Sequence, residues 1–224
     1  GNDDDVREMV SGEQGVLSVL DKGALIIDHT TTSDVLAQEL FAAAQKKEVH
    51  FLDAPVSGGQ AGAENGQLSI MVGGHPEYYH AAATAMNSYA KSTLYIGESG
   101  AGQTTKMANQ ILVAGVLQGM SEAFALVNKA GLSLDKVIEA TGAGAASSWQ
   151  LVNRGENISN DLFDYGFAID LMRKDLGICL NTAKKHDLKL PNTEWVDQCY
   201  AQLQDKGYNR SDTSVLVKQY DEQA

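Results

Sequence analysis

Hydrophobic positions along the chain follow two different patterns. In the first hundred residues, four short apolar runs are each bounded by Gly, Pro, Asp or Ser, which is typical of β-strands. The runs are Ala24–Asp28, Val49–Asp53, Leu68–Val72 and Thr93–Ile96. The first run is almost wholly apolar, as expected of a strand that is buried on both faces of a parallel sheet.

Helical spacing of apolar residues occurs between these runs. From Asp34 to Lys47 the apolar side chains recur on one face, and residues 76–91 give a further helix that begins at Pro76. The chain also opens with a predicted helix from about Asp4 to Leu20. Strand, helix and strand at these lengths form a βαβ pattern, so the first part is expected to be α/β.

After Gly102 the pattern is helical only. A long buried helix is predicted from about Gln103 to Ala130, because apolar residues surround it on all sides. Gly131 is the expected C-cap of this helix, and Ser133 the expected N-cap of the next, Leu134–Thr141. Further helices are expected over residues 170–187 and 194–206, separated by Pro191. The chain therefore divides near residues 97–102 into an α/β part and an all-α part.

The composition of the chain limits the kinds of molecule that it is expected to bind. The chain has 224 residues and a formal net charge of -12, which argues against binding a nucleic-acid backbone. No apolar run approaches the roughly 18 residues of a membrane span. The two cysteines, Cys179 and Cys199, have no metal-ligand spacing and are too few for a disulfide framework. We expect a reduced, cytoplasmic protein with no bound metal and no nucleic-acid or membrane partner.

The densest cluster of small residues is Asp53-Ala54-Pro55-Val56-Ser57-Gly58-Gly59, at the end of a predicted strand. Glycine lacks a Cβ, so a ligand can touch the backbone N–H groups there. Several N–H groups together with the Ser57 hydroxyl form a site for a carboxylate. The alternative is a plain turn, since short Ser-Gly-Gly sequences often mark one.

A second cluster begins the long helix, where Gly100-Ala101-Gly102 precedes Lys106, Asn109 and Gln110. Lys106 and Asn109 share one helix face, and Gln110 could replace or join Asn109. A partly desolvated lysine can have its pKa lowered from about 10.4 toward neutrality, and can then exchange a proton with an alcohol or carbonyl. The alternative is a lysine whose stem packs on the helix while its ammonium reaches water.

Two weaker signals remain. Hydroxyl side chains gather in Asp28-His29-Thr30-Thr31-Thr32-Ser33, between a strand and a helix. Ser33 or Asp34 is a sufficient N-cap, which explains the cluster without a ligand, but open α/β sheets also bind ligands at the carboxyl ends of their strands. The pair Lys174-Asp175 carries little information alone, because surface Lys–Asp pairs are common.

In this order, the motifs resemble those of the 3-hydroxyisobutyrate dehydrogenase family. Its relatives include tartronate semialdehyde reductases and, more distantly, 6-phosphogluconate dehydrogenases. The matching segments are DAPVSGGQAGAENGQLSIMVGG (53–74), GESGAGQTTKMANQ (97–110), GFAIDLMRKDLGICLNTAKKHDLKLP (166–191) and GYNRSDTSVLVKQY (207–220). Each segment alone is weak evidence for the family. Four segments with matching spacing, which together extend over nearly the whole chain, are specific evidence for it.

The resemblance implies an oxidoreductase that transfers a hydride between NAD or NADP and a small β-hydroxy acid or β-semialdehyde carboxylate. Lys106 would be the general acid/base and Asn109 would orient the reacting oxygen. Ser57, Gly58 and Gly59 would hold the substrate carboxylate. The sequence KMANQ is slightly more similar to the tartronate semialdehyde reductase branch.

The resemblance assigns roles to five other residues. Gln110, Phe167 and Asp175 would line the substrate pocket, while Thr31 and Lys174 would contact the cofactor. The family commonly has a second Asn where this chain has Gln110, so the identity of the functional amide is left open. It also usually has Pro at the position of Asp34.

The implied fold is α/β followed by all-α. Residues 1–98 would be part of a Rossmann-type dinucleotide-binding domain, and residues 99–224 an all-α substrate and dimerisation domain built on a long interdomain helix. Family members begin with two βαβ-type units that carry G-x-G-x-x-G, a motif this sequence lacks. We therefore expect an N-terminally truncated chain that by itself is inactive and binds NAD(P) weakly or not at all. The residues that discriminate NAD from NADP would lie in the missing part.

A homodimer or homotetramer is also expected. Gly115, Gly119 and Ala123 recur on one face of the long helix, where a second helix can approach closely, and the family resembled assembles through its all-α domain. The alternative to an enzyme is a catalytically inactive, dehydrogenase-like binding or oligomerisation module.

Overall fold

The structure, a computed structural model, describes residues 1–223 and confirms an α/β part followed by an all-α part. The chain forms two compact units, one from Gly1 to Asn109 and one from Gln110 onward. The helix α5 (Ala101–Lys129) begins in the first unit and continues into the second.

A five-stranded sheet lies at the centre of the first unit. Its strands are β1 (Leu25–Asp28), β2 (His50–Asp53), β3 (Val56–Ser57), β4 (Leu68–Gly74) and β5 (Ala90–Gly97). Parallel pairs form between β1 and β2 and between β4 and β5, but β4 runs antiparallel to β2 and β3. The expected parallel pairing thus holds for two strand pairs, but the sheet is mixed, because the chain after β2 folds back through β3 and the short helix α3 (Gly59–Glu64) instead of crossing over the sheet.

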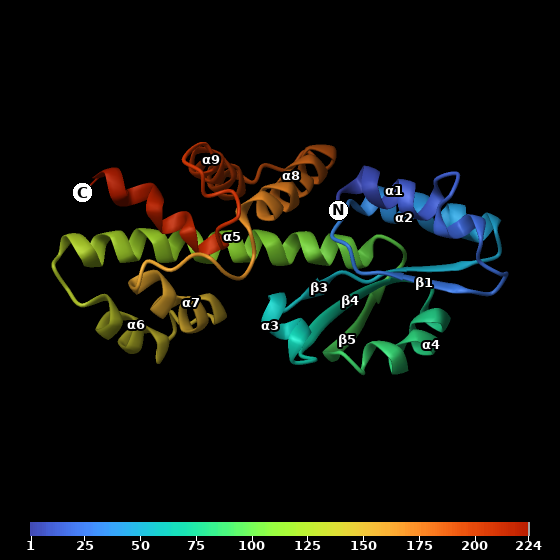
Figure 1. Cartoon of the computed structure of the whole chain (residues 1–224), viewed down its shortest axis with the longest axis horizontal. Helices are drawn as coiled ribbons and strands as arrows, with labels where there is room; N and C mark the ends of the chain where they lie inside the picture. Colours follow the sequence, from blue (N-terminus) through green and yellow to red (C-terminus); the bar gives the residue numbers. More distant parts are fainter. Residues whose placement is uncertain (224) are drawn as a thin grey trace. The chain divides into compact units, whose positions relative to one another are not determined.

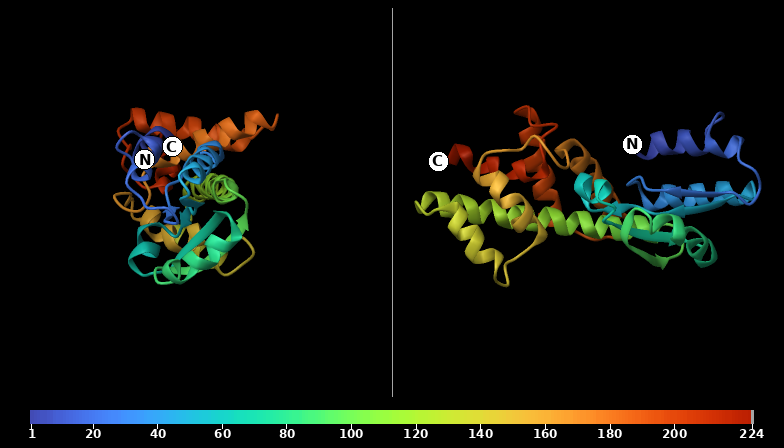
Figure 2. Two further views of the ribbon diagram at one scale, coloured as in Figure 1. Left: turned by 90° about the vertical axis from the view of Figure 1, so that its right-hand side faces the viewer. Right: turned by 60° about the horizontal axis from the view of Figure 1, so that its bottom comes forward.

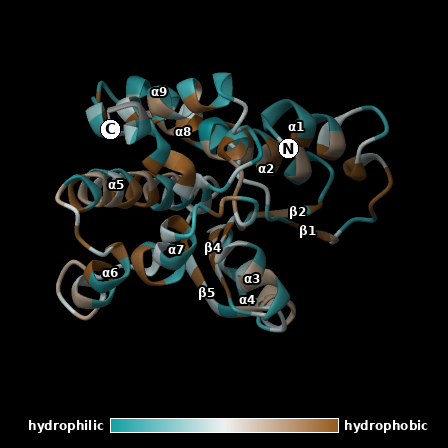
Figure 3. Ribbon diagram, turned by 60° about the vertical axis from the view of Figure 1, so that its left-hand side comes forward, coloured by the Kyte–Doolittle hydropathy of each residue, from teal (hydrophilic) through white to brown (hydrophobic). Residues whose placement is uncertain are grey.

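Helices cover both faces of this sheet (Figure 1). One face carries α2 (Asp34–Lys46) with α1 (Asp3–Ser11) beside it, and the other carries α4 (Pro76–Met86). The helix α2 begins where predicted because the Ser33 hydroxyl accepts the N–H of Leu36. Colouring by hydropathy shows β1 and β2 as apolar ribbons (Figure 3), which matches the two apolar clusters that pack on the sheet.

Two predicted helices end earlier than expected. The first helix stops at Ser11 and is followed by the short 3₁₀ turn η1 (Val16–Ser18), because the chain turns at Gly12 and Gly15. A Cβ at Gly15 would lie 2.8 Å from the carbonyl oxygen of Val10, so this close turn requires glycine. The helix expected over residues 76–91 ends at residue 86, since a turn there leads directly into β5.

In the second unit, the elements formed by residues 110–223 are helices, apart from one isolated β-bridge between Ala168 and Asp212. After α5 come α6 (Leu134–Gly142), α7 (Trp149–Ser159), α8 (Ile169–Lys185), α9 (Pro191–Asp205) and the 3₁₀ segment η2 (Thr213–Gln223). Pro191 begins α9 instead of merely separating two helices. The α8–α9 pair lies side by side in each view (Figures 1 and 2), and a single apolar cluster joins it to α5, α7 and η2.

The helix α5 is not buried all round, contrary to the sequence expectation. Its exposed face includes Gly119 and Ala123, together with Leu112 and Leu126, which are 69% and 71% exposed. By length and mean hydropathy α5 passes the test for a membrane span, but the core helix of a soluble protein passes the same test.

The first turn of α5 is fastened to the end of β2 by Asp53. The Asp53 carboxylate is fully buried and accepts the backbone N–H groups of Gly100 at 2.8 Å and Gln103 at 3.0 Å. Glycine is required beside it, because a Cβ at Gly73 would lie 2.6 Å from one carboxylate oxygen and a Cβ at Gly102 would lie 2.8 Å from the other. This junction decides where α5 starts.

Burial raises the pKa of Asp53 from 3.8 to about 6, because loss of water outweighs the N–H groups of Gly100 and Gln103 that favour the ionised form. An acid whose pKa is higher in the folded state binds its proton more tightly there than in the unfolded chain. The stabilisation from protonated Asp53 is therefore complete below pH 3.8 and is lost as the pH rises through about 6.

We predict that Asp53→Asn removes this pH dependence. The free energy of unfolding of the wild type, relative to that of the variant, should fall by roughly 3 kcal/mol between about pH 4 and pH 7. Urea unfolding at a series of pH values measures this difference. Asp28→Asn is the matched control, since Asp28 pairs in register with Asp53 at the end of β1. A difference between wild type and Asp53→Asn that stays constant with pH would contradict the assignment.

Candidate active site

The Ser57-Gly58-Gly59 turn lies between β3 and α3. Gly58 and Gly59 have φ angles of 134° and 63°, which only glycine adopts readily. A Cβ at Gly59 would meet nothing within 4 Å, so space lies open beside this backbone. The predicted turn is therefore present, and its geometry allows a ligand to approach the N–H groups.

Asn109 lies beside this turn. The Ser57 hydroxyl donates to Asn109 Oδ1 at 3.2 Å, which brings together two predicted residues that are 52 positions apart. Lys106 lies one turn before Asn109 on α5 and is only 8% exposed. This exposure argues against a lysine that simply reaches into water, so the first unit carries a nearly buried lysine one helical turn before an amide that accepts the Ser57 hydroxyl.

The loop that contains Thr31 follows β1 and is held by a residue that sequence reasoning missed. Gln103, fully buried in the first turn of α5, accepts the Thr32 N–H at 3.0 Å and donates its Nε2 to the Thr30 carbonyl at 2.7 Å. Thr31 lies between these two contacts. A glutamine near a helix start gives no distinctive sequence signal, so only the fold reveals this link.

His29 ties the same loop to its neighbours. Its Nδ1 lies 2.6 Å from the carbonyl oxygen of Ala54, which can only accept, so Nδ1 carries the proton. In the neutral ring Nε2 then accepts from the Tyr89 hydroxyl at 2.9 Å, and burial raises the pKa of Tyr89. The loops after β1 and β2 are thus joined to the start of β5.

Three further predicted residues come together within the second unit. Gln110 Nε2 donates to Asp175 Oδ2 at 2.7 Å, and the Lys174 ammonium lies 3.0 Å from Asp175 Oδ1. Asp175 is 2% exposed, whereas the Lys174 side chain is 24% exposed. The pair Lys174-Asp175, which alone indicated little in the sequence, is therefore partly buried, and Asp175 accepts a hydrogen bond from the predicted site residue Gln110.

Phe167 precedes α8 and is positioned by an ion pair that sequence reasoning also missed. Its N–H donates to Asp212 Oδ2 at 2.8 Å, and Arg154 binds both Asp212 oxygens at 2.7 and 2.8 Å. Burial opposes the ionisation of Asp212, but the Arg154 guanidinium holds the pKa of Asp212 below its usual value. Gly166, at a φ of 71°, passes so close to the carboxylate that a Cβ would collide with it.

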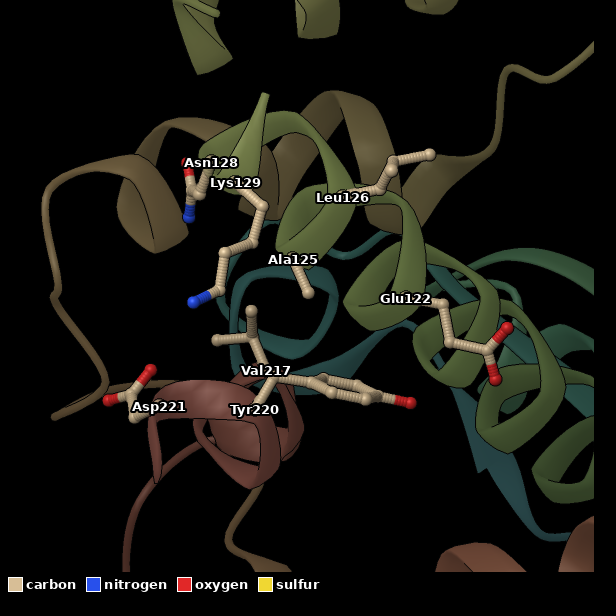
Figure 4. Close-up of a pocket in the computed structure, with 8 residues that line it drawn as sticks. All are labelled: Glu122, Ala125, Leu126, Asn128, Lys129, Val217, Tyr220 and Asp221. Carbon is tan, nitrogen blue, oxygen red and sulfur yellow. The ribbon is translucent and has the colours of Figure 1, made fainter. Parts of the chain in front are cut away.

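A groove of 420 Å³ lies elsewhere in the second unit, between the last turns of α5 and η2 (Figure 4). Its walls mix apolar and charged side chains, and Ala125 faces Val217 and Tyr220 across it. None of the predicted site residues lines this groove. Among residues 1–223, no group of three or more His, Cys, Asp or Glu side chains is placed to hold a metal ion.

Comparison with known proteins identifies the family to which the chain is similar. Residues 100–220 match the family described as the NAD-binding domain of NADP-dependent 3-hydroxyisobutyrate dehydrogenase, and residues 1–97 match the NAD-binding domain of 6-phosphogluconate dehydrogenase. An uncharacterised oxidoreductase of Shewanella frigidimarina is 46% identical over 217 residues, which are 97% of this chain and 75% of that protein.

Two named enzymes are also similar. The 2-hydroxy-3-oxopropionate reductase of Escherichia coli is 36% identical over 213 residues, 95% of this chain and 73% of that enzyme. The crystal structure of 3-hydroxyisobutyrate dehydrogenase from Salmonella typhimurium superimposes with a TM-score of 0.87 at 30% identity, covering 97% of this chain and 76% of that chain. The chain therefore belongs to the 3-hydroxyisobutyrate dehydrogenase family of NAD- or NADP-dependent oxidoreductases.

Proposed function

We propose that this chain transfers a hydride between NAD(P) and a small β-hydroxy acid or β-semialdehyde carboxylate, with Lys106 as the general acid/base. One observation carries the proposal. Lys106 is nearly buried one turn before Asn109, whose amide oxygen accepts the Ser57 hydroxyl. A desolvated amine beside hydrogen-bonding groups is suited to move a proton at an alcohol or carbonyl oxygen.

The Ser57 turn binds the substrate carboxylate in this proposal. The Ser57 hydroxyl and the N–H groups of Gly58 and Gly59 are donors, and the two positive φ angles hold the turn that presents them. A carboxylate bound at one end fixes the distance from that end to the carbonyl or hydroxyl of a small substrate. The site therefore selects its substrate by the length of the molecule and by its negative charge at the same time.

Lys106 carries the proton. During reduction its ammonium donates a proton to the carbonyl oxygen, and during oxidation the neutral amine accepts the proton of the hydroxyl. NAD(P)H, when bound, supplies the hydride that reaches the carbonyl carbon. The NH₂ group of Asn109 donates to the same substrate oxygen and keeps it directed at Lys106.

Asn109 is the amide that we assign to this role. Its oxygen accepts from Ser57 of the carboxylate-binding turn. The Gln110 amide instead donates to Asp175 and approaches the sulfur of Met172. We therefore assign Gln110 to holding Asp175, which with Phe167 contributes to the substrate pocket as the family resemblance implies.

Thr31 and Lys174 are the residues of this chain that we assign to the nicotinamide cofactor. Thr31 fits this role because it follows the carboxyl end of β1 and Gln103 holds the residues on both sides of it. The sequence contains no G-x-G-x-x-G to bind the diphosphate.

Assembly and location complete the proposal. The exposed face of α5 with Gly119 and Ala123 supports association with a second copy, as a homodimer or homotetramer, and sedimentation equilibrium that gives a monomer would contradict this. Both cysteines are buried thiols outside any disulfide, in keeping with a reduced, cytoplasmic location.

Lys106→Ala is predicted to lower kcat by roughly 10²–10⁴-fold in the natural polypeptide that contains this chain, because the proton carrier is lost. Rates are followed by NAD(P)H absorbance, and circular dichroism checks that the fold is kept. Turnover at the wild-type rate would contradict this assignment. Lys106 would then have no catalytic role, and another residue would have to carry the proton.

Ser57→Ala is predicted to raise KM for 2-hydroxy-3-oxopropionate and 3-hydroxyisobutyrate about tenfold with a smaller change in kcat, since one hydrogen bond to the bound carboxylate is removed. Ser69→Ala is the matched control, because Ser69 is the exposed cross-strand partner of Ser57. Equal activity of the wild type on analogues without a carboxylate would count against this site.

A calorimetric titration of the 224-residue chain with NADH should show weak binding or none. The reason is that the diphosphate-binding motif, which supplies much of the affinity in dinucleotide sites, does not occur in this sequence. Affinity equal to that of a family member that carries G-x-G-x-x-G would refute the expectation.

A further inference from the structure

Gln103 is a buried amide with an unusual set of partners. It is 0% exposed and lies in the first turn of α5, three residues before Lys106. Its side chain accepts the Thr32 N–H and donates to the Thr30 carbonyl, and its own backbone N–H donates to Asp53. One residue therefore joins the loop after β1, the end of β2 and the start of α5.

These contacts involve both donor and acceptor atoms of the side chain. Burying an amide without partners would cost several kcal/mol, so the side chain is locked to both loop residues at once. The two distances, 3.0 Å to the Thr32 nitrogen and 2.7 Å to the Thr30 oxygen, bracket Thr31. The loop cannot shift along α5 without breaking one of them.

We propose that Gln103 is a positioning residue that fixes the loop of Thr31 relative to Lys106; this rests on the proposed function. A residue three positions earlier in an α-helix lies about 4.5 Å away along the axis, one turn from the proton carrier. The hydride must reach the carbon and the proton the oxygen of the same carbonyl group. A small displacement of the cofactor or of the proton donor therefore lowers the reaction rate strongly. Gln103 sets the spacing between the cofactor-contacting loop and the acid/base.

The kinetic test uses Gln103→Met in the natural polypeptide that contains this chain. Met has similar length but cannot form either hydrogen bond. We expect KM for the nicotinamide cofactor to rise and kcat to fall, each about tenfold, with KM for the carboxylate substrate unchanged. Gln45→Met, at an exposed position of α2, is the matched control.

A purely structural role predicts a different result. Partial unfolding would lower the active fraction, which reduces the apparent kcat and leaves both KM values unchanged. That outcome, or wild-type kinetics in Gln103→Met, would overturn the proposal.

A second measurement needs no cofactor and no activity. Hydrogen exchange of the Thr32 N–H in the 224-residue chain should be about tenfold faster in Gln103→Met, because the N–H loses its buried acceptor. An unchanged exchange rate of the Thr32 N–H in Gln103→Met would overturn the proposed coupling between Gln103 and the loop of Thr31, even if the enzyme were inactive. Conversely, faster exchange together with a fully active Lys106→Ala variant would refute the proposed function and leave the coupling standing.

Gln103→Glu sharpens this measurement. A protonated Glu can both accept from Thr32 and donate to Thr30, whereas an ionised Glu faces the Thr30 carbonyl with no proton to give. Burial favours the protonated form, so both hydrogen bonds should form at low pH. Ionisation at higher pH removes the bond to Thr30, and repulsion between the carboxylate and the Thr30 carbonyl should loosen the loop and reduce the protection of Thr32. Comparison with Gln103→Met at each pH cancels the titration of the neighbouring groups Asp53, Asp28, Asp3 and Lys106. Protection that does not change with pH would overturn the proposed pair of hydrogen bonds.

Discussion

The structure of the first unit depends on one buried carboxylate at the start of a helix. Asp53 accepts the N–H of Gly100, just before α5, and that of Gln103 in its first turn, and this fixes both the direction and the rotation of the helix. Because α5 carries Asn109 about two turns beyond this junction, the position of Asn109 beside the Ser57 turn follows from it. A helix end without such partners would leave its N–H groups unsatisfied.

Much of the fold follows from periodicity in the sequence. The run Leu25–Ile27 forms β1 as predicted, but its side chains are half-buried and not fully buried on both faces: Ile26 packs in the cluster of α1 and α2, and Leu25 and Ile27 pack in the cluster that includes α4. The caps Ser33 and Ser133 begin their helices as predicted. Strand direction was harder to predict, because β3 is two residues long and has no periodicity of its own. Its pairing with β4 is a tertiary effect, and this pairing is what turns the expected parallel sheet into a mixed one.

Residues of the candidate site were visible in the sequence where backbone chemistry is unusual. Gly58 and Gly59 need positive φ, and a lysine beside small residues at a helix start stands out against an apolar helix. Gln103 and Asp212 were not visible, since each acts through partners that are distant in the chain, such as Thr32 and Arg154. A buried polar residue is indistinguishable from an exposed one until the fold shows what it contacts.

The buried polar groups also show how stability and function are balanced. A pKa of about 6 for Asp53 means that its ionised form costs the folded state roughly 3 kcal/mol relative to the unfolded chain. An apolar residue there would avoid this cost, but it could not accept the N–H groups that orient α5. The site is therefore held by interactions that are individually unfavourable to bury and only collectively satisfied.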